Sequence, residues 1–172
     1  MACSVRRGIG GCDHGSFAFR TPELPADAVR IVVDSNLLIR AFVNSNGLAG
    51  RLLLNIVDRG YSLLVSNEIL LEVARVLRYP RLIKLHGEDD GAVYNFVEWL
   101  RIVGEGIVLN PLLRVPIRDE SDIFVVQIAL SGGAEILCTC DRDFFEPPAS
   151  IFLASRRITV LTDVQLMRRL DA

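Results

Sequence analysis

The chain has 172 residues, of which 51% are hydrophobic and 23% are charged, so it is long enough for one domain with a sizeable core. Its net charge of −2 argues against a protein that binds polyanions over its whole surface. The positively charged residues are nearly all arginines, and Lys84 is the only lysine. No apolar run approaches the roughly 20 residues that span a bilayer, and no hydrophobic stretch follows the first arginines, so we expect a cytoplasmic protein.

Residues 1–29 differ from the rest because they are rich in glycine and proline and show no sustained period. We expect a flexible extension there and a folded domain over residues 30–172. That domain begins with a short β-branched run, residues 30–34, which is typical of a buried parallel strand. A helix from about Leu37 and a second helix over residues 48–59 are expected next, and Gly60 is placed to end the second one.

Strands and helices continue to alternate along the chain. Residues 61–66 predict a second strand, and Ser66 or Asn67 predicts the N-cap of a helix that runs to Leu77, before Pro80. We expect further helices over residues 81–86, 89–103, 122–130 and 163–170, and further strands over residues 106–110, 135–140 and 158–161. This alternation predicts an α/β/α sandwich on a mainly parallel central sheet of about five strands.

Two of the predicted strands end directly in an aspartate. Asp34 follows the first strand, and Asp141 follows the strand over residues 135–140. Ligands of open α/β sheets bind beyond the carboxyl ends of the strands, so we expect both carboxylates at the same edge of the sheet. The two cysteines of the later strand are expected to act as small apolar residues, Cys138 inside and Cys140 near that edge.

Acidic residues on predicted helices provide further candidates. Glu68 and Glu72 are four residues apart and share a helix face, and Glu72 stands in an apolar stretch. An ion pair with Arg75 or Arg78 is the alternative explanation for Glu72. Asp122 begins a predicted helix, and its alternative role is an N-cap or a favourable partner of the helix dipole.

Gathering these acids at one site costs free energy, because two like charges about 4 Å apart repel by about 4 kcal/mol at an effective dielectric near 20. Divalent cations would neutralise such a cluster. Oxygen ligands without histidine favour Mg²⁺ or Mn²⁺. A structural zinc site is not expected, because the four cysteines form no C-x-x-C pair and the two histidines match no ligand spacing.

Four motifs occur in order along the chain: "VVDSN", "SNEILLEVARVL", "RDESDIFVVQIAL" and "CTCDRDFF". Together they resemble the PIN-domain family, and within it the VapC-like toxin components of bacterial type II toxin–antitoxin systems. The resemblance spans residue 30 to about residue 170 and includes the ending "VLTDVQLMRRL". It implies a PIN-like, Mg²⁺- or Mn²⁺-dependent endoribonuclease that cuts RNA, forms a homodimer and is held in check by a cognate antitoxin.

The resemblance also implies roles for particular residues. The catalytic and metal-binding acids would be Asp34, Glu72, Asp122 and Asp141. The supporting residues would be Asn36, Ser66, Thr139 and Asp143. Two positions depart from the family pattern: Ser121 stands where a further acid is common, and Cys140 where glycine or arginine is more usual. These departures bear on metal affinity and on substrate preference.

Other functions are compatible with parts of the pattern. A catalytically silent PIN-like module would bind RNA or a protein without cutting, but it has no need to keep a repulsive cluster of acids. A phosphatase of the haloacid dehalogenase type is suggested by Asp141 and Asp143, but its Asp-x-Asp should follow the first strand. A phospho-receiver domain fits poorly, because its lysine would have to be Lys84. Two apolar helices, residues 48–56 and 93–100, are candidate surfaces for an antitoxin or a second copy, with core packing as the alternative.

Overall fold

The computed structural model describes residues 28–110, 112, 113, 115 and 120–171, and at residues 120–122 it describes the helical backbone without the side chains. Of the extension predicted for residues 1–29, all but residues 28 and 29 therefore lies outside the described residues. Among the described residues, none of the helices is long and apolar enough to cross a membrane.

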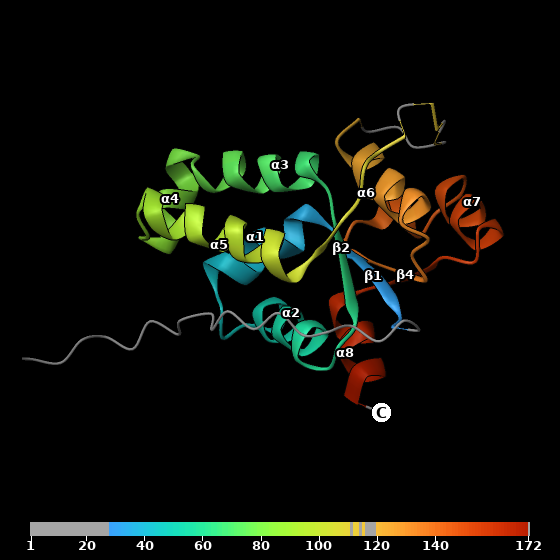
Figure 1. Ribbon diagram of the computed structural model, residues 1–172, viewed down its shortest axis with the longest axis horizontal. Helices are drawn as coiled ribbons and strands as arrows, with labels where there is room; N and C mark the ends of the chain where they lie inside the picture. Colours follow the sequence, from blue (N-terminus) through green and yellow to red (C-terminus); the bar gives the residue numbers. More distant parts are fainter. Residues whose placement is uncertain (1–27, 111, 114, 116–119, 172) are drawn as a thin grey trace, which may run out of the picture.

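The centre of the fold is a sheet of five parallel strands (Figure 1). The strands are β1 Arg30–Val33, β2 Ser62–Val65, β3 Glu105–Gly106, β4 Ile136–Cys138 and β5 Thr159–Leu161. Their order is β3-β2-β1-β4-β5, with Val32 of β1 beside Leu64 on one side and Leu137 on the other. The three central strands are almost entirely buried, as expected for strands covered on both faces. The predicted α/β sandwich with a parallel sheet is confirmed.

Eight α-helices within the described residues pack around this sheet. They are α1 Ser35–Val43, α2 Leu48–Asp58, α3 Asn67–Leu77, α4 Pro80–His86, α5 Asp90–Val103, α6 Glu120–Ser131, α7 Ala149–Ser155 and α8 Asp163–Asp171. Helix α1 contacts α2 and α3, α2 contacts α8, and α3 contacts α5. Helix α6 lies against β1, β2 and β4, so the sheet is enclosed between layers of helices (Figure 1).

Local sequence signals set most of the helix ends. Ser66 caps α3 by accepting a hydrogen bond from the backbone N–H of Ile69 at 3.4 Å, as predicted. Gly60 has a φ of 75°, the left-handed conformation that follows the end of a helix, and it stops α2 where it was expected to. The Ser66 cap places the first residue of α3 just beyond the end of β2.

Several expectations about the elements are wrong in extent. The third strand is only Glu105–Gly106, and residues 107–110 lie outside it, although the N–H of Ile107 still donates to the carbonyl of Val65 at 2.7 Å. The fourth strand ends at Cys138, two residues earlier than predicted. Two short helical segments, the 3₁₀ turn η1 Arg142–Phe144 and helix α7, were not predicted.

The apolar faces proposed as partner surfaces belong to the core. On α2, Leu52, Leu53 and Ile56 are buried, and on α5, Phe96 and Leu100 are buried. The burial of these residues supports the core-packing alternative for both helices, while Tyr94 of α5 is 60% exposed. The cysteines lie as expected, with Cys138 buried and Cys140 exposed.

Candidate active site

Asp34 is the first residue beyond β1, at the carboxyl edge of the sheet, where all five strands end. Only 2% of it is exposed. Its N–H donates to the carbonyl of Cys138 at 2.9 Å, which extends the pairing with β4 by one residue. Its carboxylate caps α1 by accepting the N–H of Asn36 at 3.4 Å, and the Ser35 hydroxyl lies at the same distance. The carboxylate is therefore held in a fixed position at the edge.

Thr139 connects this carboxylate to the second strand-end acid. The fully buried Thr139 hydroxyl donates to the second oxygen of Asp34 at 2.7 Å. The same hydroxyl oxygen accepts the backbone N–H of Asp141 at 3.0 Å. One hydroxyl therefore fixes both the Asp34 side chain and the backbone that carries Asp141.

Asp141 stands in a turn and not at a strand end. Because β4 stops at Cys138, Asp141 is the N-cap of η1, where its side chain accepts the N–H of Asp143 at 2.9 Å. Asp141 is half-buried, while the Asp143 side chain is exposed. The main contact of Asp143 is thus made by its backbone, which orients Asp141.

The environment of Asp34 disfavours its charged form. Burial raises the pKa of the Asp34 carboxyl above its usual value. The hydrogen bonds from Thr139, Asn36 and Ser35 act in the opposite direction, and the negative charge of Asp141 adds to the rise in pKa. The structure therefore brings Asp34 and Asp141 close enough for their charges to interact.

Glu72 lies on α3, the helix that begins beyond the end of β2. It is half-buried, one turn along the helix from Glu68. The two arginines considered as its ion-pair partners make other contacts: Arg78 pairs with Asp90 on α5, and Arg75 lies over the ring of Tyr79. Ser66 acts as the cap that fixes the start of this helix.

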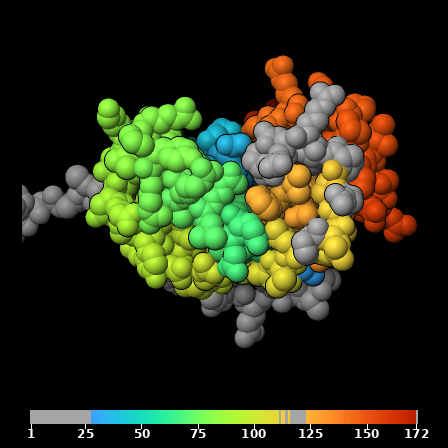
Figure 2. Space-filling view, turned by 90° about the horizontal axis from the view of Figure 1, so that it is seen from above, coloured from blue at the N-terminus to red at the C-terminus, as the bar shows by residue number. Residues whose placement is uncertain are grey.

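Asp122 lies in the first turn of α6, which begins at Glu120, so Asp122 is not the N-cap. Its side chain is outside the described part of the structure. Helix α3 contacts both α1 and α6, and Figure 2, which looks onto the carboxyl edge, shows the blue of α1 next to the green of α3. The helices that carry Glu72 and Asp122 thus flank the edge that carries Asp34.

Two residues near this edge were missed by the sequence reasoning. Asp163, at the start of α8, is 5% exposed and pairs with Arg40 of α1 at 3.2 Å. The guanidinium of Arg40 also lies 3.5 Å from the sulfur of Cys140. The signal was present, because "TVLTD" contains the fifth strand, β5, which is also followed within two residues by an aspartate. Asp163 also contributes, after burial, to raising the pKa of the Cys138 thiol.

A cavity of about 580 Å³ lies elsewhere, beside the edge strand β5. Its lining includes Phe144, Phe145, Arg157 and Thr159, and none of the candidate acids. The candidate acids and this cavity are therefore separate features.

A parallel sheet with fixed carboxylates at its carboxyl edge places this protein among the α/β folds that bind ligands beyond the carboxyl ends of their strands. The PIN domain family matches residues 30–143, about two thirds of the chain. The chain therefore belongs to the PIN domain family. It is also similar to the uncharacterized protein MJ1680 of Methanocaldococcus jannaschii, with 27% identity over 116 residues, which cover 67% of this chain and 72% of that protein.

Proposed function

We propose that this chain is an endoribonuclease that uses Mg²⁺ or Mn²⁺ to hydrolyse phosphodiester bonds in single-stranded or structured RNA. The observation that carries the proposal is the Thr139 hydroxyl, which joins the buried Asp34 carboxylate to the segment bearing Asp141. A purely structural threonine would not need to hold two acids whose charges repel. Membership of a family with a nuclease-type fold supports the same conclusion.

The donors present fit a hard divalent cation. Asp34 and Asp141 offer carboxylate oxygens, and burial makes the negative charge of Asp34 costly without a cation nearby. The proposed ligands are Asp34 and Asp141, completed by Glu72 and Asp122 from the flanking helices. When bound, the ion would activate a water molecule and stabilise charge on the scissile phosphate and the leaving oxygen.

The residues of the chain have separate tasks in this proposal. Thr139 keeps its proton directed at Asp34, so one Asp34 oxygen is committed to that hydrogen bond. Asn36 and Ser66 fix the starts of α1 and α3 through backbone and side-chain capping. Glu72 either joins the ligand set or accepts the proton that the attacking water loses as its oxygen bonds to phosphorus. Asp143 holds Asp141 through its backbone N–H.

We further propose that the chain is the toxin of a toxin–antitoxin pair, acting in the cytoplasm as a homodimer and inhibited by a cognate antitoxin. The support is the order of the four motifs along residues 30–170, which resembles the VapC-like group. Residues 30–172 would form the nuclease domain. The antitoxin would have to cover the carboxyl edge between α3 and α6 to block access to Asp34.

A second candidate function is a catalytically silent PIN-like module that binds RNA or protein. The match to the PIN domain family defines the fold and is compatible with this function as well. The two candidates differ in metal binding, which only the nuclease requires.

The deciding experiment is a nuclease assay on the purified chain, free of antitoxin, with diverse RNAs in the presence and absence of Mn²⁺. We expect cleavage with Mn²⁺ and none with Asp34→Asn, because the substitution removes the buried carboxylate charge. Isothermal titration with Mn²⁺ gives the second readout, with binding expected for the unsubstituted chain. Intact RNA together with no Mn²⁺ binding would favour the silent module.

A further inference from the structure

Helix α3 presents two solvent-facing flanks that differ in what they contact. One flank faces α5: Arg101 of α5 donates to the side-chain oxygen of Asn67 at 2.9 Å, and Arg78 pairs with Asp90. The residues between these contacts and the core are thus committed to helix packing. The other flank, away from α5, is where the surface of α3 continues toward the carboxyl edge.

The second flank carries a continuous stripe of side chains. At about 100° per residue, Glu68, Glu72 and Arg75 fall on the same side of the helix, and Tyr79, two residues beyond the helix end at Leu77, is joined to Arg75 by a hydrogen bond. Arg75 follows Glu72 by three residues, so it lies roughly 5 Å further along the helix axis, and Tyr79 lies just beyond the end of the helix. A ligand held at Glu72 would therefore pass over Arg75 and Tyr79 if it continued along α3.

Arg75 and Tyr79 form a preassembled surface. The Arg75 guanidinium carbon lies 5.4 Å from the centre of the Tyr79 ring, and Arg75 also donates a hydrogen bond to the Tyr79 hydroxyl. Both side chains are exposed, Tyr79 by 38%. A guanidinium beside an aromatic face offers a phosphate a bidentate donor and offers a base a stacking partner.

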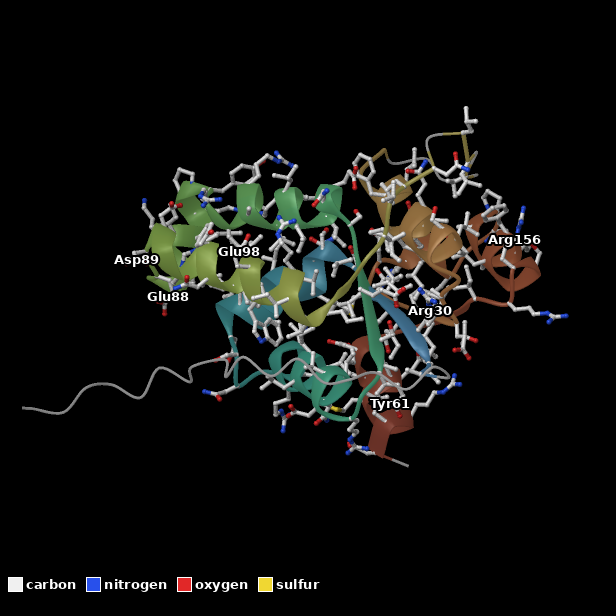
Figure 3. The ribbon with its side chains drawn as sticks, in the orientation of Figure 1. Arg30, Tyr61, Glu88, Asp89, Glu98 and Arg156 are labelled. Carbon is white, nitrogen blue, oxygen red and sulfur yellow. The ribbon has the colours of Figure 1, made fainter. Side chains whose placement is uncertain are left out.

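The charges around this surface favour a polyanion. Arg81 and Lys84 of α4 are exposed and continue the positive charge beyond Tyr79. Figure 3 shows that Glu88 and Asp89 lie at the turn between α4 and α5, and Glu98 on α5, rather than on this flank of α3. A negative backbone approaching the flank would thus meet cations after passing the acids of the site.

We propose that the flank formed by Arg75 of α3 and by Tyr79, just beyond the end of that helix, is a binding site for single-stranded RNA, with Arg75 contacting a phosphate and Tyr79 stacking on a base. The inference rests on the proposed nuclease function, because it places this RNA segment next to the bond cut at the carboxyl edge. One exposed aromatic ring and one guanidinium group suit a flexible single strand better than a duplex, because the bases of a duplex are already stacked on one another.

The test measures RNA binding without cleavage. The full-length chain carrying Asp34→Asn is titrated into a fluorescein-labelled, mixed-sequence oligoribonucleotide of about 12 nucleotides, a length in the range that single-strand sites cover. We expect Arg75→Gln in this background to weaken binding by about three- to tenfold and to reduce the slope of log K against log salt by about 0.7, the value for one phosphate contact on a single strand. Tyr79→Leu should weaken binding at least about fivefold, the loss expected for one stacked base.

Two controls separate the surface from general effects. Tyr79→Phe keeps the ring and should bind within about twofold of the parent, because stacking needs the aromatic face and not the hydroxyl. Arg169→Gln removes an equally exposed arginine from α8, and it should leave affinity unchanged. Circular dichroism melts of all variants show whether each is folded.

The outcomes are decisive in both directions. If Arg75→Gln and Tyr79→Leu bind RNA as Arg169→Gln does, the inference is overturned even when the unsubstituted chain cuts RNA with Mn²⁺. If these two variants keep RNA affinity but change the molecular mass measured by light scattering, the flank is a protein contact and not an RNA site. If the folded Asp34→Asn chain binds no RNA, the inference is overturned as well, while the cleavage assay on the unsubstituted chain separately decides the proposed function.

Discussion

At the scale of single residues, Asp34 combines near-complete burial with a raised pKa. The buried negative charge lowers the stability of the metal-free protein, but the same charge favours the binding of a cation. The folded-state pKa lies above the ordinary carboxyl value of 3.8, so the native protein holds the Asp34 proton more tightly than the unfolded chain does. The resulting stability is fully present below about pH 3.8 and is lost as the pH rises through the folded-state pKa. At neutral pH the metal-free protein therefore carries the cost of a buried charge.

We predict that Asp34→Asn stabilises the metal-free protein at neutral pH, because asparagine keeps an acceptor for Thr139 and cannot ionise. Each unit of raised pKa corresponds to about 1.4 kcal/mol. Each kcal/mol raises the melting temperature of a domain this size by about 2–4 °C. Thermal unfolding in chelator at several pH values measures the difference from the unsubstituted protein, which should be small near pH 4 and grow as the pH rises.

The matched control is Asp143→Asn, which changes an exposed carboxylate in the 3₁₀ turn after Asp141 and leaves the buried Asp34 carboxyl in place. A lower melting temperature for Asp34→Asn than for the unsubstituted protein at neutral pH, in the absence of metal, would contradict the account of the Asp34 charge. The pH dependence of the stability would then have to come from another titratable group.

At the scale of elements, the ion pair of Arg40 and Asp163 fastens α1 to α8 near the carboxyl edge. The side chain of Asp163 is 7% exposed and that of Arg40 is 53% exposed, so the two partners are solvated very differently. The buried aspartate depends on its partner more than the arginine does. The N–H of Val164 also donates to the Asp163 carboxylate at 2.8 Å.

We predict that Arg40→Met destabilises the protein by about 1–2 kcal/mol, an estimate below that for fully buried pairs because Arg40 is half in water. Asp163→Asn should cost less, since it leaves no uncompensated charge in the interior. The double variant should be more stable than the sum of the two losses implies. Urea unfolding followed by the fluorescence of Trp99, which is 2% exposed, measures all three free energies.

Arg51→Met on α2 is the control, because it removes an exposed arginine from the same layer of helices. Equal losses for Arg40→Met and Arg51→Met would show that the pair with Asp163 contributes nothing.

The elements also show which features of the fold could be predicted from the sequence. Strands β1 and β2 were predicted because their apolar runs are bounded by a polar cap at the next helix, as at Ser66. The end of β4 was placed two residues late because "CTC" has strand-like composition, while the structure uses Thr139 as a hydrogen-bonding residue. Helix α7 was missed because it follows Pro147 and Pro148 and spans only seven residues.

The candidate site, like the fold, could be predicted from the sequence only in part. The proximity of Asp34 and Asp141 followed from the rule that parallel strands end at one edge, although Asp141 lies in the turn after β4 and not at the strand end. The burial of Asp163 could not be predicted, because an aspartate at a helix start is ordinarily a solvated partner of the helix dipole. Only the packing of α8 against α2, and the position of Arg40 on α1, turn Asp163 into an interior ion pair.

At the scale of the whole molecule, metal binding should be coupled to global stability, because the proposed ligands come from the junction of β1 and α1, from α3, from α6 and from the turn after β4. An unfolded chain cannot keep these segments together, so the ion binds the native state alone. We predict that Mn²⁺ at about 100 times its dissociation constant stabilises the protein by about 2.7 kcal/mol, which corresponds to a rise of about 5–11 °C in melting temperature.

Differential scanning calorimetry with and without Mn²⁺ measures this shift, and excess chelator should reverse it. Asp34→Asn should lose most of the shift, while Arg169→Gln should keep it. A shift of the same size in Asp34→Asn would mean that the ion binds elsewhere.

The hydrogen bond between Thr139 and Asp34 joins residues 105 positions apart, and this separation has a consequence for the order of folding. Strands β1, β2 and β3 can pair once residue 106 has been made, whereas β4 must close a much longer loop to reach the other side of β1. During synthesis the first half of the sheet can therefore form while Asp34 still lacks both Thr139 and Asp141. A chain that cuts RNA would therefore be unable to cleave the messenger RNA from which it is being translated until its last third has emerged. We accordingly expect ribosome-bound chains halted near residue 110 to show no Mn²⁺-dependent cleavage of RNA.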